Sequence, residues 1–190
     1  MSKVTLAASA GFCFGVKRAI EMAYAEIEKN NGTPLYSYGP LIHNKEVTND
    51  LEKKGLHIIE GLDGIDEGTV VIRSHGVGRF LYDALEKRGM RIVDGTCPFV
   101  KKIHTIVNEA WKQGKGVLIA GDGSHPEVMG INGWCGGEAI ILENPEAAAA
   151  AALDLEKEYA IVVQTTFRQS KFDAMLAILK ERGVRAEVFQ

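Results

Sequence analysis

Two cysteines occupy matching places in two similar stretches of the sequence. Residues 11–17 read GFCFGVK and residues 95–101 read GTCPFVK, so Cys13 and Cys97 have the same offsets to a glycine, a valine and a lysine. The chain has 3 cysteines, an odd number, and no Cys-x-x-Cys pair. This usage argues against a disulfide framework, a zinc ribbon and a thioredoxin-type pair. The repeated thiol indicates two thiolates that bind one shared group. An iron–sulfur cluster held by thiolates from separate turns suits that layout best.

Three histidines follow apolar runs typical of short strands. His43 comes after residues 35–39, His75 after 70–74, and His125 after 117–121. Thr165 ends a further run of this kind. Because ligands of open parallel sheets bind beyond the carboxyl ends of the strands, where helix N-termini also favour phosphate, we expect these side chains to share one edge with the thiols.

Glu127 lies two residues after His125, and we interpret it as a candidate proton donor beside a bound substrate. A zinc deaminase also uses His-x-Glu, but it needs a downstream Pro-Cys-x-x-Cys that this sequence lacks. A metal-dependent hydrolase that uses His125 and Glu127 stays open as an alternative. A diphosphate-binding module without catalysis also stays open.

The other cysteine and histidines have plainer interpretations. Cys135 lies outside the repeat, beside Trp134, and is expected to be a small buried apolar residue. His57 is expected on the surface. His104 lies on a predicted helix, one turn after Val100, and is expected to pack or to face solvent.

Strand-like runs alternate with helical stripes along the whole chain, which predicts βαβ units and parallel sheets flanked by helices. The similar stretches recur about 84 to 94 residues apart, the size of a small domain rather than of a solenoid repeat. We therefore predict two similar α/β domains, residues 1–95 and 96–190. Residues 1–10 are interpreted as a first strand, and Asn144-Pro145-Glu146 as a helix start with a cap side chain and an early proline.

Composition limits the classes of function. The formal net charge of −3 argues against binding nucleic acid through a basic surface, and no apolar run is long enough to cross a membrane. The amino-terminal apolar stretch is too short for an export signal, so we expect a cytoplasmic protein. No phosphate-binding loop or Gly-x-Gly-x-x-Gly motif follows a strand, and nucleotide cofactors are not indicated.

Six motifs together resemble the 4-hydroxy-3-methylbut-2-enyl diphosphate reductase family, also called LytB or IspH. They occur in the family's order over the whole chain: GFCFGVKRA (11–19), LIHN (41–44), SHGV (74–77), DGTCPFV (94–100), HPEV (125–128) and QTT (164–166). The resemblance implies three similar α/β domains around a central cavity. It also implies an iron–sulfur enzyme that removes a hydroxyl reductively and makes isopentenyl and dimethylallyl diphosphate, the last step of the non-mevalonate isoprenoid pathway.

The resemblance also implies roles for individual residues. Cys13 and Cys97 are expected to be two of three cysteine ligands of a [4Fe-4S] cluster, with a flavodoxin or ferredoxin as electron donor. His43, His75 and His125 are expected to contact the diphosphate, Thr165 to position substrate, and Glu127, with His125 nearby, to deliver a proton. The third cluster cysteine and the third domain of the family have no counterpart in this sequence. We therefore expect this chain to correspond to the first two domains and to be inactive by itself.

Overall fold

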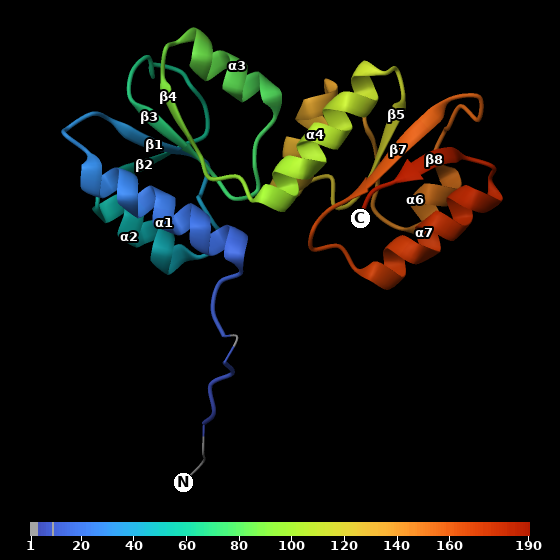
Figure 1. The fold of residues 1–190 in the computed structure, drawn as a ribbon, viewed down its shortest axis with the longest axis horizontal. Helices are drawn as coiled ribbons and strands as arrows, with labels where there is room; N and C mark the ends of the chain where they lie inside the picture. Colours follow the sequence, from blue (N-terminus) through green and yellow to red (C-terminus); the bar gives the residue numbers. More distant parts are fainter. Residues whose placement is uncertain (1–3, 9) are drawn as a thin grey trace.

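The computed structural model describes residues 4–8 and 10–190, and its core is two separate parallel β-sheets (Figure 1). The first sheet has the strand order β2-β1-β3-β4, and the second has the order β6-β5-β7-β8. The strands of the first sheet are β1 (Leu35–Tyr38), β2 (Leu56–Ile59), β3 (Thr69–Ile72) and β4 (Arg91–Asp94). Those of the second are β5 (Gly116–Ala120), β6 (Ile140–Leu142), β7 (Glu158–Val163) and β8 (Arg185–Val188). The two halves therefore have the same connectivity, as the sequence repeat predicts.

Helices cover both faces of each sheet. They are α1 (Phe14–Lys29), α2 (Lys45–Lys53), α3 (Arg79–Lys87), α4 (Pro98–Lys112), α5 (Pro126–Asn132), α6 (Pro145–Ala150) and α7 (Gln169–Glu181), with a 3-10 turn η1 (Gly133–Cys135). In the first half, α1 and α2 lie on one face and α3 on the other (Figure 1). In the second half, α6 and α7 cover one face, while α4 and α5 cover the other and lie toward the first sheet.

Central strands are apolar because both of their faces are covered. All four residues of β3 are buried, and they alternate between two cores. Val71 packs with α1 and α2, whereas Val70 and Ile72 pack with α3. Continuous apolar runs of this kind are typical of parallel strands buried on both sides.

The two halves meet at η1 and the turn before α3. The Trp134 indole N–H donates to the Val77 carbonyl at 2.9 Å. A Cβ on Gly133 would lie 2.5 Å from the Gly78 Cα, so the two backbones approach too closely for any larger side chain. This contact fixes the turn that carries His75 against the half that carries His125.

The helices expected after Cys13 and Cys97 are confirmed. The helix start at Asn144 is also confirmed, because its side chain accepts from the Ala147 N–H at 2.7 Å. The strand expected over residues 1–10 is wrong for residues 4–8 and 10, which form no strand, and residues 1–3 and 9 lie outside the described residues. An isolated apolar segment with no neighbouring strand cannot complete a ladder. The division at residue 95 stays a prediction. Among the described residues, no helix is long and apolar enough to cross a membrane.

Candidate functional site

Three histidines from both halves lie together beyond the carboxyl ends of the strands. His43 lies between β1 and α2, His75 in the turn between β3 and α3, and His125 at the start of α5 after β5. The ring centroids are 4.6 Å apart for His43 and His75, 5.4 Å for His75 and His125, and 5.9 Å for His43 and His125. One ring nitrogen from each lies within 4.8 Å of the others. The three histidines therefore lie together at one edge, as the sequence predicts.

The tautomer of His125 is set by its place in the helix. His125 is the N-cap of α5, and its Nδ1 accepts from the Glu127 N–H at 3.1 Å. A neutral imidazole whose Nδ1 accepts must carry its proton on Nε2. The cap hydrogen bond thus leaves the Nε2–H of His125 free to donate in a fixed direction.

His75 is held unprotonated at neutral pH. Burial lowers the pKa of His75 to about 4, and the neighbouring His43 and His125 rings and the Arg73 cation act in the same direction. Its Nδ1 is buried without a hydrogen-bond partner among the described residues. A buried polar atom of this kind costs free energy unless a ligand or water satisfies it.

Glu127 is a buried carboxylate joined to Thr165. Its side chain is 3% exposed. One carboxylate oxygen accepts from the Thr165 N–H at 2.7 Å, and the other accepts from the Thr165 hydroxyl at 2.8 Å. Thr165 itself is exposed, so the pair joins a buried carboxylate to a residue at the surface.

Gln164 holds the loops after β5 and β7 together, because its side-chain oxygen accepts from the Asp122 N–H at 3.0 Å. Gln164 directly precedes Thr165, and Asp122 lies in the loop that leads to Glu127. The two elements that carry the pair therefore keep a fixed separation.

Cys13 and Cys97 each precede the first turn of a helix, α1 and α4, and neither side chain caps its helix. Cys13 is exposed and Cys97 is half-buried, and both are free thiols. A Cβ on Gly15 would lie 2.5 Å from the Cys97 sulfur, so the first turn of α1 lies directly against that thiol. Helix N-termini favour thiolates because their free N–H groups carry partial positive charge.

The thiol turn and the histidine cluster adjoin each other. The Cys97 N–H donates to the carbonyl of Ser74, the residue before His75, at 2.9 Å. Arg18 of α1 donates to the Thr96 carbonyl at 3.2 Å, which ties the first thiol helix to the second thiol turn.

Cys135 and His57 are where the sequence places them. Cys135 is fully buried in the core under α4 and α5, its S–H donates to the Asn132 carbonyl at 3.2 Å, and burial raises its pKa. His57 is exposed on β2.

Sequence reasoning missed the tight environment of His104 and the position of Arg73. His104 is 2% exposed and stacks on Trp134 with ring centroids 5.1 Å apart, and its Nε2 has no hydrogen-bond partner within residues 4–8 and 10–190. The helical spacing left packing and exposure to solvent both open for His104, and the structure shows packing. Arg73 follows β3 directly, and a basic residue at the end of a strand does not by itself indicate a binding role.

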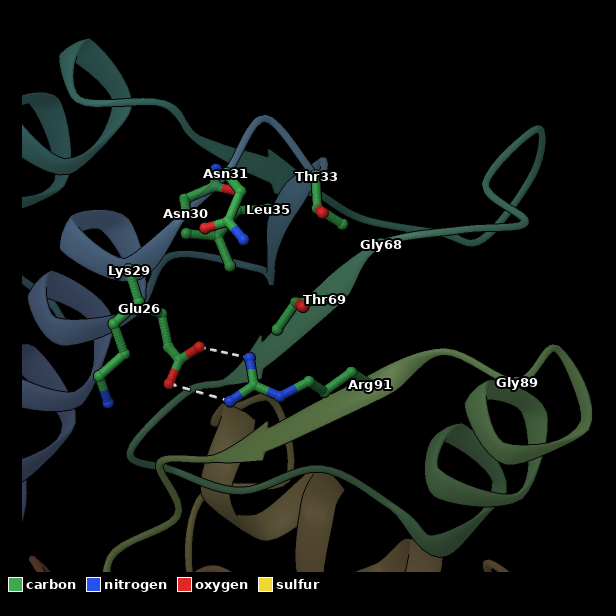
Figure 2. Close-up of a pocket in the computed structure, with 10 residues that line it drawn as sticks. All are labelled: Glu26, Lys29, Asn30, Asn31, Thr33, Leu35, Gly68, Thr69, Gly89 and Arg91. Carbon is green, nitrogen blue, oxygen red and sulfur yellow. Dashed lines mark hydrogen bonds and ion pairs between the residues drawn. The ribbon is translucent and has the colours of Figure 1, made fainter.

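A hollow of about 440 Å³ lies at the opposite edge of the first sheet (Figure 2). It opens at the amino-terminal ends of β1, β3 and β4, where Leu35, Thr69 and Arg91 line it. Figure 2 shows the Arg91 guanidinium paired with both oxygens of Glu26, so its main charges already satisfy each other. The polar groups that converge are at the other edge, which is where parallel sheets bind ligands.

Two matched parallel sheets, each preceded by a thiol turn and joined by a shared histidine cluster, define the class: the chain belongs to the LytB protein family, whose model matches residues 4–190. Among individual proteins it is similar to the 4-hydroxy-3-methylbut-2-enyl diphosphate reductase of Thermoanaerobacter sp. (strain X514), with 48% identity over 94% of this chain and 62% of the relative.

Two solved structures are similar in fold. The E-1-hydroxy-2-methyl-but-2-enyl-4-diphosphate reductase from Plasmodium falciparum has a TM-score of 0.86 at 27% identity, and the match covers 95% of this chain and 57% of that one. A structure of (E)-4-hydroxy-3-methyl-but-2-enyl diphosphate reductase, the terminal enzyme of the non-mevalonate pathway, has a TM-score of 0.81 at 34% identity. That match covers 100% of this chain and 67% of the other. The chain spans about 62% of the length of its first curated relatives.

Proposed function

We propose that this chain forms the diphosphate-binding and proton-delivering part of a 4-hydroxy-3-methylbut-2-enyl diphosphate reductase. The reaction removes the allylic hydroxyl of that substrate by reduction and gives isopentenyl and dimethylallyl diphosphate. The observation that carries the proposal is the histidine cluster beside a buried carboxylate–threonine pair, with two free thiols on adjoining turns. The names of the curated relatives and of the solved structures support the same assignment.

The histidines are the proposed diphosphate ligands. Phosphate oxygens accept hydrogen bonds, and the Nε2–H that the α5 cap leaves on His125 is a donor of fixed direction. His43 is exposed on its loop, so it can reach a ligand without rearrangement of the core. A bound anion raises the proton affinity of His75 and can supply a partner for its buried Nδ1.

Glu127 is the proposed proton donor, and Thr165 is its link to the substrate. When Glu127 is protonated, its carboxyl O–H can donate across the same 2.8 Å contact to the Thr165 oxygen. Thr165 can then pass its own hydroxyl proton to the leaving hydroxyl and take the Glu127 proton in return. The transfer leaves Glu127 as a carboxylate held by the Thr165 N–H at 2.7 Å. Thr165 is also the residue that we propose to position the substrate oxygen, since it is exposed.

Cys13 and Cys97 are the residues that would hold an iron–sulfur cluster. They fit that role because both are free, neither caps its helix, and Gly15 lies directly against the Cys97 sulfur. When bound, the cluster would supply a Lewis acid for the allylic oxygen and would relay two electrons, one at a time, from an external electron donor. A small iron–sulfur or flavin protein, ferredoxin or flavodoxin, is the proposed electron donor.

Two thiols are fewer than the three that the family resemblance implies. Cys135 is buried in another core and its S–H is already bonded, so it is not the third. We therefore expect this chain to bind the diphosphate and not to complete the reduction by itself.

The cap hydrogen bond disfavours the alternative of a metal-dependent hydrolase. A metal bound at Nε2 of His125 would require a proton on Nδ1, which would set that N–H against the Glu127 N–H. Glu127 is also occupied by Thr165 through both oxygens. The same cluster suits an anion without any such rearrangement.

The test combines binding with turnover. The chain is reconstituted anaerobically with iron and sulfide and titrated calorimetrically with 4-hydroxy-3-methylbut-2-enyl diphosphate, and the products are then assayed with a chemical reductant. We expect binding that His43→Ala weakens and that His57→Ala, a change at an exposed histidine outside the cluster, leaves unchanged. Absence of binding would refute the proposal. Turnover with a full complement of iron would refute the expectation that two thiols are insufficient, and stoichiometric zinc would favour the hydrolase.

A further inference from the structure

Arg73 contacts the two loops that carry His43 and His75. Its Nε donates to the Gly76 carbonyl at 3.5 Å, and the Gly76 N–H donates to the Arg73 carbonyl at 3.0 Å, so Arg73 closes the turn around His75. A Cβ on Gly39 would lie 2.7 Å from Nη1 of Arg73. Gly39 has a φ of +70° and begins the loop that leads to His43, so the guanidinium lies directly on that loop.

The charge of Arg73 is half-buried and lacks a counter-ion. Among the described residues, no carboxylate forms an ion pair with it, whereas Arg79, Arg88 and Arg91 each have an acidic partner within 4 Å. Of its five N–H donors, only Nε has a hydrogen-bond partner in the described part of the chain, and that bond is long. A desolvated cation without a counter-ion is costly unless an anion binds beside it.

We propose that the Arg73 guanidinium is the fixed positive charge of the histidine cluster and the counter-charge of the bound diphosphate. This inference rests on the proposed function, since it assumes that the cluster takes a diphosphate. It adds to the site a residue that no sequence motif marks.

The proposal gives the site a fixed positive charge for a strongly charged ligand, although His75 supplies none at neutral pH. His75 is unprotonated at neutral pH, and the tautomer of His125 suits a neutral donor. Neutral imidazoles orient an anion by hydrogen bonds but contribute no net charge. A guanidinium does both, because it is always charged and presents its donors in a planar fork that matches phosphate oxygens.

The experiment measures the affinity of inorganic pyrophosphate by calorimetry at neutral pH and low salt. Arg73→Met removes the charge and keeps the length of the side chain, and Arg73→Gln removes the charge but keeps a donor for the Gly76 carbonyl. Arg73→Lys keeps the charge. Arg88→Met, at the C-terminal end of α3, is the matched control. Thermal unfolding of each variant separates loss of binding from loss of fold.

We expect Arg73→Met and Arg73→Gln to weaken binding about 10- to 100-fold, the range for a lost charge-assisted hydrogen bond. Arg73→Lys should stay within about fivefold of the parent, because it restores the charge. Equal affinity in the parent and the neutral variants would overturn the proposal. A lysine variant as weak as the methionine variant would overturn it too, since that outcome assigns Arg73 to loop packing alone. If the parent chain binds no pyrophosphate, both the proposed function and the role of Arg73 fail. If the parent and the neutral variants bind equally well, only the role of Arg73 fails.

Discussion

His104 should make the stability of this protein fall steeply in mild acid. The ring is buried against Trp134, and a Cβ on Gly76 would lie 2.5 Å from its Cε1. Burial lowers the pKa of His104 from 6.5 to about 4. The negative charge of Asp94 opposes this shift, and the positive charge of Lys101 adds to it.

The sign of the effect follows from proton binding. The folded state holds His104 neutral down to about pH 4, whereas the unfolded chain protonates it near 6.5. Between these two values the unfolded state binds one more proton, so stability is complete above the unfolded pKa and is lost as pH falls. With those two pKa values, the loss is roughly 2 kcal/mol between about pH 7.5 and about pH 5, and about 3.4 kcal/mol below pH 4.

The assay is urea unfolding followed by tryptophan fluorescence at a series of pH values. His104→Phe keeps a flat ring against Trp134 but cannot titrate, and His104→Leu is a second apolar variant. Because His75 titrates in the same direction, the measured quantity is the difference in pH dependence between the parent and each variant. The absolute stability of either variant does not enter.

The parent should lose about 2 kcal/mol more than the variants over this pH interval. If the stability difference between parent and variants stays constant from neutral pH to about pH 5, the reasoning is refuted. That result would mean that the buried ring accepts a proton as easily as a free imidazole.

Further predictions concern the site and the contact between the halves. Glu127→Gln should leave diphosphate binding within about threefold of the parent, because the amide oxygen can still accept from the Thr165 N–H; pyrophosphate calorimetry measures this. The same substitution should abolish proton delivery, which product analysis checks in a turnover-competent protein of this family. Gly15→Ala should destabilise the fold by about 1 to 3 kcal/mol and displace the Cys97 thiol, although alanine is the better helix former, since the new methyl group would overlap the sulfur; urea unfolding and thiol reactivity measure both. Trp134→Phe should cost about 1 to 3 kcal/mol by leaving the Val77 carbonyl without its indole donor, and an unchanged unfolding midpoint would contradict that role.

The sequence predicted the elements well where its signal was local. Helical stripes after Cys13 and Cys97 and the cap at Asn144 gave correct helices, because each depends on neighbouring residues only. The strand prediction is wrong for residues 4–8 and 10 because an apolar run resembles a strand whether or not it has a partner strand.

The candidate site was predictable to the extent that its residues follow strands. Parallel strands bring their carboxyl ends to one edge, so His43 and His75 could be expected together without knowledge of the packing. The cap bond of His125 is local, since it joins residues two apart. The place of Arg73 against the Gly39 loop and the burial of His104 against Trp134 depend instead on contacts between distant segments. No spacing in the sequence encodes such contacts.

The duplicated halves make the site its own control. His43 and His125 occupy related positions in the two repeats, and in the folded chain their rings lie 5.9 Å apart. One of the pair is exposed on a loop, and the other is committed to a helix cap. Substitution of either histidine therefore changes the same chemistry at the same ligand but with different structural constraint. The difference between the two variants measures what fixing an imidazole in place contributes to binding, a quantity that a site built from unrelated residues cannot provide.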